Sequence, residues 1–170
     1  ATFACFQEVR GHIGQAYELA RTLASSHVVC YSFADTEASG GLISTIDKRF
    51  LGEDYTIEVT SESPGREMVV TIGTSLGTMR IVNLHLLPGR QLSLLQKKQA
   101  LRRVATALDP DAGHHGFDAG DFNFPEVGEC VVRADALDGV ASPTIAQFWS
   151  RDAPHLSEIY QGDWTRQGEG

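Results

Sequence analysis

Apolar residues recur along the chain with two different spacings, and these spacings predict a mixture of helices and strands. In residues 12–25 and again in residues 92–108 they recur every three or four positions, which is typical of amphipathic helices. Short runs rich in apolar and β-branched residues predict strands between them. These runs are residues 1–6, 27–33, 42–46, 55–60, 67–72, 79–84 and 116–119.

Glycine, proline and polar residues separate the predicted elements. Pro64-Gly65 and residues 75–77 separate three successive strands, which predicts antiparallel hairpins. Gly40-Gly41 permits a tight bend, without the Lys-Ser/Thr pair of a phosphate-binding loop. Residues 109–113 predict a loop, and we interpret His114-His115 as part of that loop rather than as a metal site, because adjacent side chains of an extended chain point apart.

Composition favours a folded chain without a membrane segment. The length of 170 residues suits one domain over residues 1–170, and 42% of the residues are apolar. No run of about 18 apolar residues exists, so we expect no membrane span. Residues 1–6 lack the basic segment of a signal peptide, and the three cysteines lack disulfide or metal spacing, which favours an intracellular, reducing compartment. Two runs near the C-terminus, residues 131–137 and 144–149, are too short to assign.

The formal net charge of −8 bears on possible partners. A protein that binds the nucleic-acid backbone strongly usually carries a basic face, so the acidic excess counts against such a binder. The excess fits carboxylates gathered for a divalent metal, and it equally fits an ordinary solvated surface.

Asp121 and Asn123 form the first candidate site, directly after the strand over residues 116–119. We expect the chain to turn at Gly120. Alternate residues of an extended segment point to the same side, so the carboxylate and the carboxamide are expected to reach one spot. Such a pair suits a phosphate ester, because the acid manages a proton or a hydrated metal and the amide orients an oxygen. A Gly-Asp turn with an Asn cap is the structural alternative.

Asn83 and His85 form a second pair with the same spacing, near the end of another apolar strand. Histidine titrates near neutral pH and can contact a phosphate oxygen, although a buried core histidine is the structural alternative. Glu8 follows the first strand, either at a ligand-binding sheet edge or at the start of the next helix.

Basic residues give weaker indications of a phosphate site. Arg66 stands at a strand entrance and is a candidate phosphate contact, or else a solvated surface residue. A basic cluster on the second helix could touch a nucleic-acid backbone or form an exposed face. Its members are Lys97, Lys98, Arg102 and Arg103.

Three motifs in this order resemble those of the endonuclease/exonuclease/phosphatase superfamily. They are Phe6-Gln7-Glu8, Asn83-Leu84-His85 and Gly120-Asp121-Phe122-Asn123. The resemblance implies an α/β fold, a four-layer sandwich of two mostly antiparallel sheets face to face with outer helices. Thr165-Arg166 resembles a segment of the endonuclease domains of non-LTR retrotransposons.

The resemblance also implies roles for individual residues. Glu8 would hold Mg²⁺ or Mn²⁺, Asp121 would handle the attacking water, and Asn123 would lie beside the scissile phosphate. His85 would contact the phosphate or the leaving group, with Asn83 and Arg66 as further substrate contacts. The implied activity is a Mg²⁺-dependent phosphodiesterase, a DNA endonuclease module of a retroelement polyprotein, which would act in the nucleus. The alternatives are a phosphoesterase of the same fold acting on a small phosphorylated molecule or lipid headgroup, and a non-catalytic remnant.

The chain departs from the superfamily pattern at both ends. The family's first strand should precede Glu8 by a helix or more, and a Ser-Asp-His segment, whose histidine is the general acid/base, is absent from the sequence. His155 is followed by Leu156-Ser157 and does not match it. We therefore expect a fragment of a longer protein, or a degenerate copy, with little phosphodiesterase activity alone. Asp118 is a further departure, since the family's strand carries an aliphatic residue there.

Overall fold

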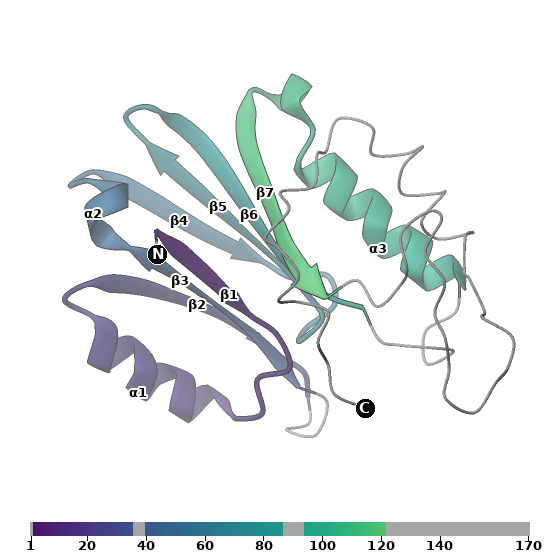
Figure 1. Ribbon diagram of the computed structural model, residues 1–170, viewed down its shortest axis with the longest axis horizontal. Helices are drawn as coiled ribbons and strands as arrows, with labels where there is room; N and C mark the ends of the chain where they lie inside the picture. Colours follow the sequence, from purple (N-terminus) through teal and green to yellow (C-terminus); the bar gives the residue numbers. More distant parts are fainter. Residues whose placement is uncertain (1, 36–39, 87–93, 122–170) are drawn as a thin grey trace, which may run out of the picture.

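Two β-sheets form the centre of the chain in the computed structural model, which describes residues 2–35, 40–86 and 94–121 (Figure 1). The strands are β1 Phe3–Phe6, β2 His27–Phe33, β3 Gly41–Asp47, β4 Tyr55–Thr60, β5 Glu67–Thr74, β6 Gly77–His85 and β7 His114–Asp121. The helices are α1 Ile13–Leu23, the short α2 Lys48–Leu51 and α3 Leu94–Ala107, followed by the 3₁₀ turn η2 Pro110–Ala112.

The two sheets differ in strand number and direction. The first has three strands in the order β1-β3-β2, and both of its pairings are antiparallel. The second has four strands in the order β4-β5-β6-β7. Its first three strands are antiparallel, whereas β6 and β7 are parallel and are connected through α3. A crossover helix of this kind is the usual connection between parallel neighbours.

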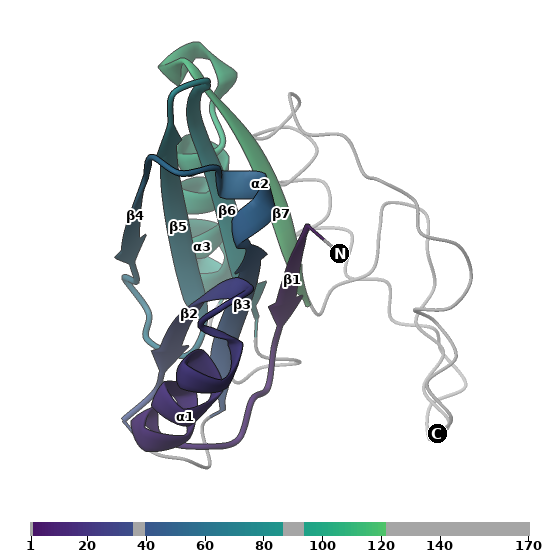
Figure 2. The same cartoon turned by 90° about the vertical axis from the view of Figure 1, so that its left-hand side faces the viewer.

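Apolar side chains pack in two clusters and define four layers. Between the sheets lie Cys30, Leu42, Ile46, Leu51, Met68, Val70, Ile72 and Ile81. Between the second sheet and α3 lie Val82, Leu84, Leu86, Ala100, Leu101, Val104 and Leu108. Strand β6 contributes to both clusters because successive side chains alternate between the two faces of a sheet. Helix α1 covers the outer side of the first sheet and α3 the outer side of the second (Figures 1 and 2).

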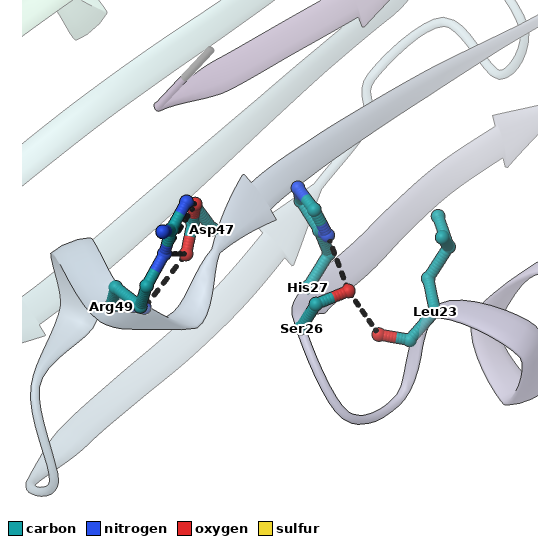
Figure 3. A network of polar contacts seen from close by, with 5 residues as sticks. All are labelled: Leu23, Ser26, His27, Asp47 and Arg49. Atoms are coloured by element: carbon teal, nitrogen blue, oxygen red, sulfur yellow. Dashed lines mark hydrogen bonds and ion pairs between the residues drawn. The ribbon is translucent and has the colours of Figure 1, made fainter.

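Polar contacts fix the connections at the end of the first sheet where β1 begins (Figure 3). Asp47 closes β3 and caps α2, since its Oδ1 accepts from the Arg49 backbone N at 2.9 Å. The Arg49 side chain also donates to this carboxylate, and these hydrogen bonds lower the pKa of Asp47 to about 2. Ser26 Oγ donates to the carbonyl oxygen of Leu23 at 3.3 Å and lies 2.8 Å from Nδ1 of His27. Both connections are therefore closed by side chains close in sequence.

The α/β sandwich expected from the sequence is confirmed, and β2 and β4 have the predicted bounds. Three expectations were wrong. His114-His115 begins β7 instead of continuing a loop, residues 110–112 form a 3₁₀ turn, and the chain does not turn at Gly120, since β7 extends to Asp121. A side chain at Gly120 would collide with the backbone of Leu84, so the glycine permits a close approach of two strands. The expectation of one domain over residues 1–170 stays a prediction, and residues 131–137 and 144–149 lie outside the described residues.

Candidate active site

Glu8 stands two residues beyond the end of β1, on a sharply turned backbone. Its φ angle of 54° lies in the left-handed region, where a residue with a side chain is strained and must be held by its surroundings. The next residue, Val9, donates its backbone N–H to the carbonyl oxygen of Gly41 at 3.0 Å. The Glu8 side chain is 68% exposed, so its carboxylate is available to solvent and to ligands.

His85 ends β6 and lies between an acid and a base. Its Nε2 is 3.2 Å from Oε1 of Glu8, and its side chain is only 3% exposed. On the other side of the ring, Nη1 of Arg66 donates to Nδ1 at 2.8 Å. A guanidinium can only donate, so Nδ1 is the acceptor and a neutral His85 carries its proton on Nε2, facing Glu8. The contact with Glu8 is within ion-pair distance but lacks hydrogen-bond alignment, so Nε2 is buried without a hydrogen-bond partner in the described part of the chain.

Asp121 ends β7 directly beside His85. The two residues are partners in the parallel pairing of β6 and β7, and the Leu86 backbone N donates to the Asp121 carbonyl oxygen at 2.8 Å. Residues in register on neighbouring strands point to the same face of a sheet. The C-terminal ends of β1 and β7 also point the same way (Figures 1 and 2). The fold therefore gathers Glu8, His85 and Asp121 at one edge of the sandwich.

The other three predicted site residues are Arg66, Asn83 and Asn123. Arg66 holds the His85 ring, as described above. Asn83 is 0% exposed, and its amide is engaged with Gln7, Phe6, Ile43 and Ser44, an arrangement that differs from the substrate contact expected from the sequence. Asn123 lies outside the described residues, so its role stays a prediction. Sequence reasoning gave Gln7 no role, although it is the residue before Glu8.

The donor set at this edge suits a hard divalent cation. The described residues contain no group of three or more His, Cys, Asp or Glu side chains arranged to hold a metal. In the part of the chain that the structure describes, the candidate donors at this edge are the carboxylates of Glu8 and Asp121. Mg²⁺ is commonly held by only one or two carboxylates and keeps several waters, so this sparse set fits Mg²⁺ better than a metal that needs a full protein cage. Nε2 of His85 is an N–H donor that an acceptor oxygen of a ligand can engage.

A second polar region lies on the opposite face of β5–β7, beneath α3. Nη2 of Arg103 lies 2.6 Å from Oε2 of Glu67, a carboxylate only 3% exposed. Asp118 has no such partner among the described residues: both of its carboxylate oxygens are buried without a hydrogen bond, although the residue as a whole is partly exposed. This burial, together with the charge of Glu67, raises the pKa of Asp118 to about 7.

The basic cluster predicted on α3 is therefore not one exposed face. Arg103 is engaged with Glu67, and Lys97 is buried, which lowers its pKa. Both residues belong to the side of α3 that faces the sheet. The expectation that all four basic residues lie on the helix surface was wrong for these two.

Similar structures include a humanized D. rerio TDP2 carrying 14 mutations, with 16% identity and a TM-score of 0.52 over 74% of this chain and 50% of that one. D. rerio TDP2 complexed with single-strand DNA product matches with 15% identity and a TM-score of 0.52, over 74% of this chain and 49% of that one. The human Nocturnin catalytic domain with a bound sulfate anion matches with 12% identity and a TM-score of 0.53, over 88% of this chain and 56% of that one.

The chain shares the fold of these proteins. Their likeness agrees with the α/β sandwich of two sheets and outer helices that was expected from the sequence. The chain spans about half the length of these structures. No family model and no curated protein sequence matches it. Among the described residues, no helix is long and apolar enough to cross a membrane.

Proposed function

We propose that the chain carries part of the active site of a Mg²⁺-dependent phosphodiesterase. The observation that supports this most is the meeting of three strand ends: Glu8 lies 3.2 Å from His85, and His85 is in register with Asp121. An acid, a histidine and a second acid at one exposed edge form a combination suited to metal-assisted hydrolysis of a phosphate ester.

Each residue has a distinct proposed task. Glu8 and its waters would hold Mg²⁺, which when bound stabilises the negative charge developing on the phosphoryl oxygens. Asp121 would orient the attacking water and accept its proton as the new P–O bond forms and the ester P–O bond breaks. His85 would donate its Nε2 proton in a hydrogen bond to a phosphoryl oxygen. Arg66, by donating to Nδ1, keeps that proton on Nε2. Asn123 would orient the phosphate.

DNA is the substrate that we favour, within an endonuclease module of a retroelement-type polyprotein that acts in the nucleus. The support is the Gly-Asp-Phe-Asn motif at residues 120–123 together with Thr165-Arg166. One similar structure, D. rerio TDP2, is complexed with single-strand DNA product. A small phosphorylated molecule is the second candidate, and the formal net charge of −8 favours it. Salt distinguishes the two, because binding of a nucleic-acid backbone weakens steeply as salt rises.

The test is cleavage of supercoiled plasmid DNA, and hydrolysis of a small phosphodiester, at several Mg²⁺ and salt concentrations. We expect slow, Mg²⁺-dependent turnover that Asp121→Asn and Glu8→Gln each reduce at least 100-fold, and a matched control, exposed Glu18→Gln on α1, leaves unchanged. Turnover that persists in both variants, or that needs no metal, contradicts the proposal. Hydrolysis of the small diester alone, insensitive to salt, would favour the second candidate.

A further inference from the structure

A partly buried network of side-chain amides, in which Asn83 is fully buried, lies next to the proposed site. Nε2 of Gln7 donates to Oδ1 of Asn83 at 2.8 Å and lies 3.5 Å from the carbonyl oxygen of Ala119. These three residues belong to the chain segments that end in the three site residues. Gln7 precedes Glu8 by one position, while Asn83 and Ala119 each precede their site residue, His85 and Asp121, by two.

We propose that Gln7 and Asn83 are positioning residues that fix the three strand ends relative to one another. We call this set of contacts the Gln7–Asn83 network. This inference rests on the proposed function for its consequence, metal binding, but its structural content concerns the backbone of Glu8 and its placement against His85. It gives Asn83 a role that differs from substrate contact.

The hydrogen-bond inventory of Asn83 supports this role. Its Nδ2 has three acceptors within reach, the carbonyl oxygen of Ile43 at 3.1 Å, Ser44 Oγ at 3.2 Å and the carbonyl oxygen of Phe6 at 3.3 Å. An amide has two N–H donors, so both are engaged within the protein, and its oxygen is engaged with Gln7. Asn83 thus joins β6 of one sheet to β1 and β3 of the other.

Directional contacts matter here because the inter-sheet cluster itself is apolar, and Ser32 of β2 supplies further ones through Ser61 and the Gly65 backbone N. Apolar packing is not directional, so it allows small sliding motions of one sheet on the other. The hydrogen bonds of the buried Asn83 amide specify one arrangement, since any other leaves a buried polar group without a partner. The strained backbone of Glu8, with φ of 54°, begins one residue beyond Gln7 and needs such support.

The Gln7→Met variant removes the amide while keeping a side chain of similar length and flexibility. Gln7→Asn keeps the amide but shortens its reach by one methylene. The matched control is Ile46→Val, a change in the inter-sheet cluster at the end of β1 remote from Glu8, where Ile46 pairs with Phe3. All three variants are compared with the parent 170-residue chain.

Two measurements test the proposal. The first is the three-bond amide–Hα coupling of Glu8 and its nuclear Overhauser contacts with the His85 ring, which report the backbone φ and the Glu8–His85 approach. The second is the Mg²⁺ dissociation constant from calorimetry. We expect Gln7→Met to change the coupling, to weaken the contacts and to weaken Mg²⁺ binding about tenfold, as is typical when a residue behind a metal ligand is lost. Gln7→Asn should have a smaller effect in the same direction.

The outcomes separate the two proposals. A Gln7→Met chain with unchanged Glu8 coupling and His85 contacts overturns the positioning role, as does an equal change in Ile46→Val. If Gln7→Met fails to fold, Gln7→Asn decides by the same criteria. If Glu8→Gln leaves Mg²⁺ affinity unchanged, the proposed function fails, while the coupling of Glu8 still decides whether Gln7 positions it.

Discussion

Asp118 should make the fold less stable as the pH rises from about 4 to about 7. Its carboxylate oxygens are buried without hydrogen bonds on the face of β7 that is turned towards α3. Charged side chains of β5, β6 and α3 also reach this layer, among them the buried Lys97 of α3. Glu67 of β5 is paired with Arg103 of α3, and Arg80 of β6 donates to the carbonyl oxygen of Ala107. Asp118 is therefore a carboxyl group that the fold accommodates best when it is protonated.

The magnitude follows from the pKa of this group. Burial raises it from 3.8 to about 7, a difference of about three pH units. Each unit corresponds to about 1.4 kcal/mol, so the free energy of unfolding should fall by up to about 4 kcal/mol between these pH values. The sign follows from proton binding: in this window the folded state holds a proton that the unfolded state has released, so removing protons favours unfolding.

The assay is urea unfolding of the parent chain and of Asp118→Asn at pH 5, 6, 7 and 8. The asparagine variant keeps the shape of the side chain and removes its titration, so we expect it to lose most of the decrease that the parent shows. Asp111→Asn, an exposed acid in η2, is the matched control and should keep the pH dependence of the parent. If the free energy of unfolding depends on pH equally in the parent and in Asp118→Asn, Asp118 is not the cause of the decrease.

Three further predictions test other parts of the fold. Arg103→Met should lower the free energy of unfolding, measured in urea, by about 2–3 kcal/mol, which is below the range for fully buried pairs because the Arg103 side chain is 38% exposed. Adding Glu67→Gln should restore most of this stability, and a double variant without restoration would argue against an uncompensated charge on Glu67 as the cause. Gly65→Ala should lower the melting temperature more than Gly113→Ala does. Both glycines have φ of +74°, but of the two only Gly65 has other atoms near the position of a Cβ, the nearest at 2.7 Å. Equal melting temperatures of the two variants would contradict this prediction. The carboxyl group of Asp47 should titrate near pH 2 when followed by NMR, so its contribution to stability is lost as the pH falls from about 4 to 2. A titration midpoint near pH 4 would show that this carboxylate does not stabilise the fold.

The secondary structure was largely readable from the sequence because most elements are long enough to show their period. Strands β2 and β4 have the predicted bounds, while α2 was missed since its four residues span little more than one turn, too few for apolar residues to recur at helical spacing. The sequence did not indicate that Lys97 and Arg103 lie inward on α3. The partner of Arg103 is a glutamate 36 positions away, and such pairings leave no local pattern.

In the candidate site, too, contacts between residues distant in sequence could not be predicted from the local pattern. Motif order predicted Glu8, His85 and Asp121 as site residues, and the fold brings these three to one edge. The network next to them was not predictable from the pattern of residues. Asn83 reaches acceptors 39, 40 and 77 positions away, so its burial depends on how the two sheets pack. An Asn two residues before a His fits a substrate contact and a structural anchor equally well in sequence.

Paramagnetic broadening by Mn²⁺ tests most directly whether Glu8, His85 and Asp121 form one metal-dependent site. Small amounts of Mn²⁺ are added to the ¹⁵N-labelled chain, and the amide signals are followed by NMR. We expect the signals of these three residues to broaden together at the lowest Mn²⁺ concentrations, and Glu8→Gln to weaken the broadening of the other two. Broadening confined to one of the three, or centred on another region of the chain, would contradict this expectation.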